Sequence, residues 1–108
     1  MNFKEYTIDF SDVTSFFEMH FTIRDSLEFP YYYGCNWDAL WDCLTDLAGE
    51  PLRIKIIGLE VISTKKFDDS AETFVEILKE FKHYENDAYS DMISIEIINK
   101  KTGEITAI

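Results

Sequence analysis

The segment from Pro30 to Leu47 constrains the fold of this chain more than any other part of the sequence. Its second half has the three- and four-residue spacing of an amphipathic helix. Asn36 stands just before this pattern and is a favourable N-cap, because its side-chain oxygen can accept a free backbone N–H. The sequence therefore predicts a helix that follows Asn36 and buries one face. The apolar stripe on that face consists of Trp37, Leu40, Trp41, Leu44 and Leu47.

A different face of this helix carries Asp38, Asp42 and Asp46, which are four residues apart. Only Asp38 gains from the positive end of the helix dipole, and each like-charge pair at this spacing costs roughly 0.2–0.5 kcal/mol. A helix selected only for stability has little reason to keep such a row. The row therefore favours a surface that binds a basic partner. The alternative for Asp38 is a first-turn residue that merely suits the dipole.

The loop before the helix contains three consecutive tyrosines, Tyr31 to Tyr33. Pro30 prevents the preceding helix from continuing, and Gly34 is expected to give the loop backbone freedom. Tyrosine offers a large contact area and a polar tip at low entropic cost, which favours it in binding surfaces. Beside the carboxylate row, the tyrosine loop predicts a surface that suits a basic cleft.

The chain has 21 acidic and 10 basic residues among 108, a formal net charge of −11. This charge argues against nucleic acid as a direct ligand, and it either favours a basic protein partner or serves only solubility. The length predicts one domain over residues 1–108, and the hydrophobic fraction of 46% excludes disorder. We expect neither a membrane span nor a signal peptide, and a cytoplasmic protein that is monomeric when free.

The cysteines and histidines do not indicate catalysis. Cys35 and Cys43 have neither a disulfide framework nor metal-ligand spacing, so both are expected to be reduced thiols, with Cys43 as a small filler in the core. His20 and His83 lack companion ligands and are expected to be structural or surface residues. The sequence has no glycine-rich phosphate loop, nucleophile–base pair or metal motif. It therefore predicts a protein that is not an enzyme and needs no cofactor.

Periodicity divides the rest of the chain into alternating strands and helices. Strands are predicted at 6–10, 52–57 and 93–97, and helices from Ser15 to about Leu27 and from 69 to 81. Residues 59–67 read as one or two helical turns, 84–91 as a polar loop, and 99–103 as a turn before a short C-terminal strand. Strands separated by helices predict right-handed crossovers and a small parallel sheet of the α/β class.

Capping boxes are expected at Ser15 with Glu18 and at Asp69 with Glu72. In the helix that begins after Ser15, Phe17 and Phe21 widen the apolar stripe. We therefore expect this helix to be covered on two sides.

Residues 32–44 read Tyr-Tyr-Gly-x-Asn-x-Asp-Ala-Leu-Trp-Asp-Cys-Leu and closely resemble the signature of the barstar family, intracellular inhibitors of ribonucleases. The resemblance extends upstream through His20, Thr22, Leu27 and Pro30, downstream through Thr45, Pro51 and Leu52, and more loosely over 71–81. It implies a three-stranded parallel sheet packed with about four helices. The possible C-terminal β-hairpin would be an addition to that plan.

The resemblance also implies residue roles. Asp42 would reach deepest into the phosphate site of a ribonuclease. The rim and the substrate-binding loops of the enzyme would be contacted by Asp38, Asn36, Gly34 and Tyr32. Thr45 and Glu80 would complete the patch. The expected partner-binding residues are Tyr32, Tyr33, Gly34, Asn36, Trp37, Asp38, Asp42, Thr45, Asp46 and Glu80.

Three positions depart from the founding member of the family: Cys35 replaces an acidic residue, Trp37 a smaller aliphatic one, and Asp46 a glycine. These changes leave the inhibitor class intact but leave the target open. The predicted function is inhibition of a cognate ribonuclease or ribonuclease toxin. Two alternatives stay open: an acidic adaptor whose partner is not a nuclease, and a divalent-cation site on Asp38, Asp42 and Asp46.

Overall fold

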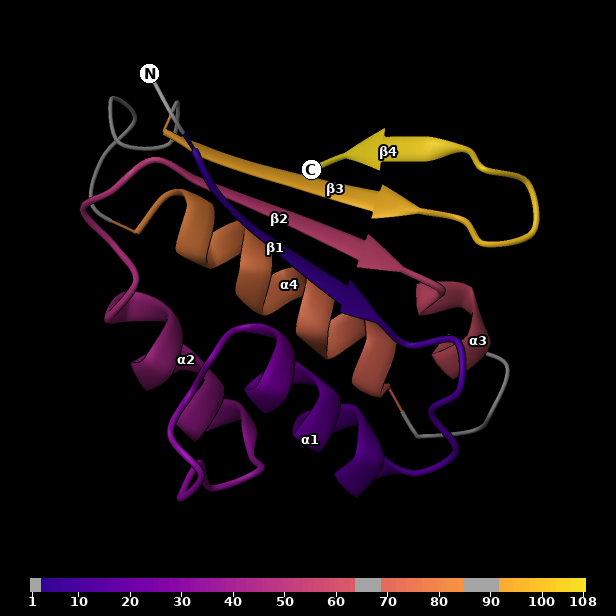
Figure 1. The fold of residues 1–108 in the computed structure, drawn as a ribbon, viewed down its shortest axis with the longest axis horizontal. Coiled ribbons are helices and arrows are strands. Elements are labelled where there is room, and N and C mark those ends of the chain that lie inside the picture. The colour runs from indigo at the N-terminus through magenta and orange to yellow at the C-terminus, as the bar shows by residue number, and fades with distance from the viewer. Residues whose placement is uncertain (1–2, 64–68, 85–91) are drawn as a thin grey trace.

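The structure is a computed structural model that describes residues 3–63, 69–84 and 92–108. Two helices separate the first strand from the second along the chain, two more separate the second from the third, and a fourth strand follows the third directly (Figure 1). In chain order they are β1 (Lys4–Asp9), α1 (Phe16–Ser26), α2 (Trp37–Thr45), β2 (Leu52–Ile57), α3 (Leu59–Ser63), α4 (Ser70–Lys82), β3 (Ile93–Ile98) and β4 (Ile105–Ala107). Within the described ranges no helix has the length and apolar character needed to cross a membrane.

The strands form one sheet in the order β1-β2-β3-β4. The first three strands are parallel, and their register aligns Tyr6 with Ile54 and Ile54 with Ile95. β4 pairs antiparallel with β3 after a turn in which the Asn99 side chain accepts the N–H groups of Lys101 and Thr102, at 2.9 and 3.1 Å. Both the predicted parallel sheet and the predicted C-terminal hairpin are therefore confirmed.

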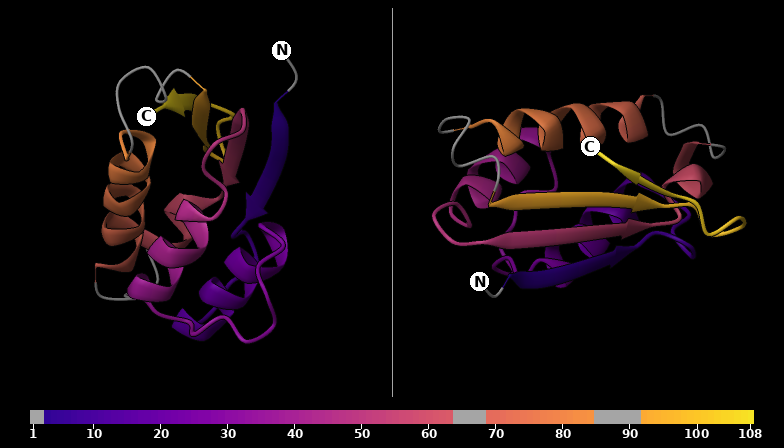
Figure 2. Two further views of the ribbon diagram at one scale, coloured as in Figure 1. Left: turned by 90° about the vertical axis from the view of Figure 1, so that its left-hand side faces the viewer. Right: turned by 90° about the horizontal axis from the view of Figure 1, so that it is seen from above.

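The helices α1, α2 and α4 lie on one face of the sheet and leave the other face uncovered (Figure 2). The strand residues that point toward the helices are buried, and those between them are more exposed, as in β1 and β2. On the open face, Lys55 pairs with Glu5 at 3.0 Å. The alternation predicted from sequence thus separates an apolar layer from a polar surface.

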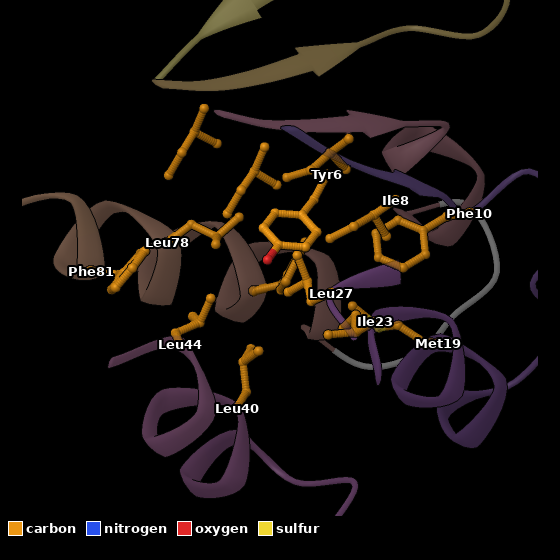
Figure 3. Close-up of a cluster of buried hydrophobic side chains, with 14 of the residues drawn as sticks. Tyr6, Ile8, Phe10, Met19, Ile23, Leu27, Leu40, Leu44, Leu78 and Phe81 are labelled. Carbon is orange, nitrogen blue, oxygen red and sulfur yellow. The ribbon is translucent and has the colours of Figure 1, made fainter. Parts of the chain in front are cut away.

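The core fills the space between the sheet and the helices (Figure 3). The three parallel strands and the helices α1, α2 and α4 all contribute residues that are almost completely shielded from water. They include Ile8 from β1, Met19 and Ile23 from α1, Leu40 and Leu44 from α2, and Leu78 and Phe81 from α4. Because Leu40 and Leu44 are anchored in this core, the opposite face of α2 is turned outward in a fixed orientation.

The prediction that α1 is covered on two sides is wrong. Phe17 is 62% exposed and Phe21 is 42% exposed, and the two rings lie 6.5 Å apart on the outer side of the helix. α1 lies at the edge of the helical layer, so that one side packs on the core through Met19 and Ile23 while the other meets solvent (Figure 2). Periodicity finds the apolar rows of a helix but does not reveal whether a neighbour covers each row.

The two predicted capping boxes differ from expectation. Ser15 does cap α1 by accepting the Glu18 N–H at 3.2 Å, but the Glu18 carboxylate accepts from the N–H and hydroxyl of Thr14. Asp69 stands at the N-cap of α4 and makes no side-chain capping hydrogen bond, so this prediction is wrong. Its φ of −98° and ψ of 26° lie outside the extended region that aims a capping side chain at the first turn.

The predicted helical turns at 59–67 are confirmed for α3, and residues 64–67 lie outside the described residues. Of the predicted loop at 84–91, the described residues include only Tyr84. Gly58 precedes α3 with φ +78°, and a side chain there would approach the Ser11 backbone nitrogen to 3.2 Å. Glycine is therefore required where β2 turns into α3.

Candidate protein-binding site

The start of α2 is fixed by both ends of the Asn36 side chain. Its carboxamide oxygen accepts the Ala39 N–H at 2.8 Å, and its amide nitrogen donates to the Gly34 carbonyl at 3.2 Å. The predicted N-cap is thus confirmed, and the same residue ties the loop to the helix. The carboxylates of α2 consequently project from a helix whose position is set at its first residue.

Gly34 is needed for a reason other than the expected backbone freedom. Its φ lies outside the left-handed region, and the left-handed residue of the loop is Cys35, with φ +51°. A Cβ at Gly34 would lie 3.2 Å from the Asn36 amide nitrogen and 3.4 Å from the Ala39 Cβ. A larger residue would therefore push against the cap of α2.

Tyr33 lies beneath the loop and not on its surface, which differs from its expected place among exposed contact residues. Its side chain is 6% exposed, and its hydroxyl is 2.6 Å from Nδ1 of the fully buried His20. Burial raises the pKa of the Tyr33 hydroxyl and lowers the pKa of His20 to about 4. His20 is therefore a neutral structural residue near pH 7, and it anchors the loop to α1.

Trp37 also faces inward to a large extent. It is half-buried, with its ring 4.7 Å from the His20 ring and 5.9 Å from that of Phe16. These contacts join the first turn of α2 to the first turn of α1. Trp37 and Tyr33 thus form, with His20, the floor under the exposed part of the loop.

The exposed aromatic side chains of the loop are Tyr31 and Tyr32. Tyr31 is 87% exposed, Tyr32 is 75% exposed, and their rings meet edge to face at 5.6 Å. Rings of this size left in water at a loop tip offer apolar area and hydroxyl groups to a partner. Tyr31 was not among the predicted contact residues, although its place in the tyrosine run indicated it.

The carboxylates predicted to meet the partner lie on the surface. Asp38, Asp42, Asp46 and Glu80 are all exposed, and within residues 3–63, 69–84 and 92–108 none of them forms an ion pair. Asp38 and Asp42 lie in the body of α2, whereas Asp46 is its C-cap residue. The helix ends at Thr45, so the predicted apolar stripe extends two residues beyond it.

Two further residues of α2 contribute mainly to the helix itself. Thr45 is half-buried, and its hydroxyl donates to the Asp42 carbonyl at 2.9 Å. Cys43 is half-buried against the core; burial raises the pKa of its thiol, and the charges of Asp46 and Asp42 add to this effect. Cys35 and Cys43 are both free, as predicted.

The acidic row does not assemble into a metal site. Among the described residues, no three His, Cys, Asp or Glu side chains come together as metal ligands. Side chains along one helix diverge from its axis, so Asp38, Asp42 and Asp46 do not converge on a point. Carboxylates spread along a helix in this way are instead suited to contact several cationic groups on the surface of another molecule.

The fold and this surface define a small α/β protein that exposes carboxylates and tyrosines on a helix and loop fixed by buried contacts. The family model described as "Barstar (barnase inhibitor)" matches residues 3–96. This chain belongs to the barstar family of ribonuclease inhibitors, and it is not an enzyme. The predictions of family, fold class and inhibitor class are confirmed.

A relative from Bacillus subtilis (strain 168), named "Putative ribonuclease inhibitor YrdF", is 37% identical to this chain over 82 residues. The matched region covers 73% of this chain and 90% of the relative. The similarity thus extends over most of both proteins and includes more than the signature around α2.

Proposed function

We propose that this chain is a cytoplasmic inhibitor of a cognate barnase-type ribonuclease or ribonuclease toxin, against which it confers immunity. α2 and the tyrosine loop enter the basic active-site cleft of that enzyme. The observation that carries this proposal is the pair of exposed carboxylates, Asp38 and Asp42, which have no ion-pair partner among the described residues. The free inhibitor is a monomer that does not bind nucleic acid.

The chemistry of a ribonuclease cleft explains why carboxylates fit it. Such a cleft concentrates arginine, lysine and histidine to hold phosphates and to stabilise the charge that develops during phosphoryl transfer. Carboxylates on successive helical turns take the places of phosphates, with Asp42 deepest and Asp38 toward the rim. Because the Asn36 cap already holds the helix in place, little conformational freedom is lost on binding.

The remaining predicted residues divide by position. Tyr32 and the backbone at Gly34 meet the substrate-binding loops of the enzyme, and Tyr31 adds to this contact. Tyr33 and Trp37 contribute indirectly: they hold the loop in place from its buried side, consistent with their burial. The outer part of the patch consists of Asn36, Thr45, Asp46 and Glu80.

Long-range charge adds to the contact energy. With a formal net charge of −11, the inhibitor attracts a basic enzyme from a distance and raises the association rate. The effect requires that the target enzyme be strongly basic around its cleft.

Replacement of Asp42 by alanine tests this proposal. In a titration of barnase activity on RNA, we expect the wild-type chain to inhibit and Asp42→Ala to require roughly a hundredfold higher concentration. The expected loss is about 3 kcal/mol, the value of two hydrogen bonds between a carboxylate and cationic donors. Glu76→Ala is the matched control, because Glu76 is also exposed and its loss changes the net charge equally.

Equal inhibition by wild type and Asp42→Ala would contradict the assigned role of the helix. No inhibition of barnase by the wild type would contradict a barnase-type target. Tight binding of the wild type without loss of nuclease activity would favour an acidic adaptor over an inhibitor.

A further inference from the structure

A second aromatic pair joins the middle of the acidic helix α2 to the end of α4. The ring of Tyr84 meets the ring of Trp41 edge to face, with 5.5 Å between centroids and 85° between planes. Tyr84 follows the C-cap of α4, where its N–H donates to the Phe81 carbonyl at 3.0 Å, and its side chain is 46% exposed. The sequence alone indicated only the start of a polar loop at this position.

This pair lies beside the carboxylates. Asp38 lies three residues before Trp41 and is therefore its neighbour on the surface of α2, and Asp42 follows Trp41 directly in the chain. Glu80 lies in the last turn of α4, which ends at Lys82, and Tyr84 follows the C-cap residue His83. The acidic face is therefore flanked by Tyr31 and Tyr32 at the loop and by the Trp41–Tyr84 pair at the end of α4.

An aromatic ring at the rim of a charged contact alters the strength of that contact. When a partner covers the acidic face, a ring at its edge keeps water and ions away from the pairs formed inside, where a lower effective dielectric strengthens them. The edge-to-face contact with Trp41 restricts the Tyr84 ring in advance, so its ordering costs little on binding.

We propose that Tyr84 contacts the ribonuclease directly and, together with Trp41, shields the Asp42 ion pairs from solvent at the α4 edge of the interface. This inference rests on the proposed function and adds a contact residue to it. In this proposal Tyr84 makes no ion pair of its own. It strengthens the interface by shielding the ion pairs that neighbouring carboxylates make.

Shielding of the ion pairs should change the dissociation rate, whereas long-range charge steering changes the association rate. Tyr84→Ala should raise the dissociation rate from barnase about tenfold and leave the association rate nearly unchanged. Its dissociation rate should also rise more steeply with salt than that of the wild type, because ions then reach the Asp42 pairs. Tyr84→Phe keeps the ring and should resemble the wild type.

The experiment measures binding of the full chain to immobilised barnase at about 50 mM and about 300 mM NaCl, where the screening lengths differ by a factor of about 2.4. Phe21→Ala is the matched control, because Phe21 is 42% exposed but lies on the outer side of α1. Asp42→Ala reports on the proposed function in the same assay. Thermal unfolding of each variant verifies that it is folded, and Tyr84→Leu provides a second variant that keeps apolar volume without the ring.

Three outcomes are informative. Faster, more salt-sensitive dissociation of Tyr84→Ala, with Phe21→Ala unchanged, supports the inference. Unchanged dissociation of Tyr84→Ala at both salt concentrations overturns it, while a loss of binding by Asp42→Ala in the same series leaves the proposed function intact. Failure of the wild type to bind barnase overturns the proposed function and this inference with it.

Discussion

At the scale of single residues, the backbone conformation of the tyrosine loop differs from the one that its sequence predicts. Gly34 was expected to supply unusual backbone freedom, but the left-handed conformation falls on Cys35. Glycine is required at 34 because the Asn36 amide lies 3.2 Å from where a Cβ would be. A non-glycine residue held in the left-handed region costs about 1 kcal/mol or more, so Cys35 stores strain beside the proposed binding surface.

Cys35→Asn should relieve this strain, because asparagine tolerates the left-handed region. We expect the free energy of unfolding to rise by about 0.5–1 kcal/mol, with an unchanged dependence on urea concentration. Cys35→Val is the opposing control, since a β-branched side chain is poorly accommodated there. A Val variant as stable as the Asn variant would show that Cys35 is not strained.

At the scale of elements, α1, the loop and α2 are joined through one buried contact between His20 and Tyr33. His20 is fully buried with a pKa of about 4, against 6.5 for a free side chain. The unfolded chain therefore binds a proton more readily than the folded chain between these two values. The stabilisation from neutral His20 is fully present above pH 6.5 and is lost as the pH falls toward 4.

His20→Gln should make stability less dependent on pH in this window. Between pH 7 and pH 5, the wild type is expected to lose about 2 kcal/mol of unfolding free energy because of His20. The variant should not show this loss. The pKa values of Glu5 and Asp9, lowered by bonds to Lys55 and Ser11, also reduce stability in acid, but equally in both proteins. Urea unfolding across this range measures the difference, and parallel pH profiles would contradict the assignment.

The elements themselves were predictable because their signals are local. Alternation in β1, β2 and β3 and the stripes of α1, α2 and α4 follow from which residues face the core. The exposure of Phe17 and Phe21, the inward turn of Tyr33 and the contact of Tyr84 with Trp41 depend on neighbours distant in the sequence. Local patterns carry no information on which element lies opposite, so these features required the structure.

At the scale of the whole molecule, the sheet and its helices form a support for one acidic surface. The core anchors α2 through Leu40 and Leu44, which leaves Asp38 and Asp42 exposed. The class of protein could be predicted from the run of residues 32–44. Which residues of that run are exposed could not be predicted, because burial depends on contacts with elements distant in the sequence.

The central claim is that these carboxylates occupy the phosphate sites of a ribonuclease, and steady-state kinetics test it most directly. With barnase and an RNA substrate, the inhibitor should be strictly competitive: it should raise KM and leave kcat unchanged, because enzyme with its phosphate sites filled cannot bind RNA. Asp42→Ala should raise the inhibition constant and keep the competitive pattern. A fall in kcat at saturating RNA would mean that inhibitor and substrate bind together, and would contradict the claim.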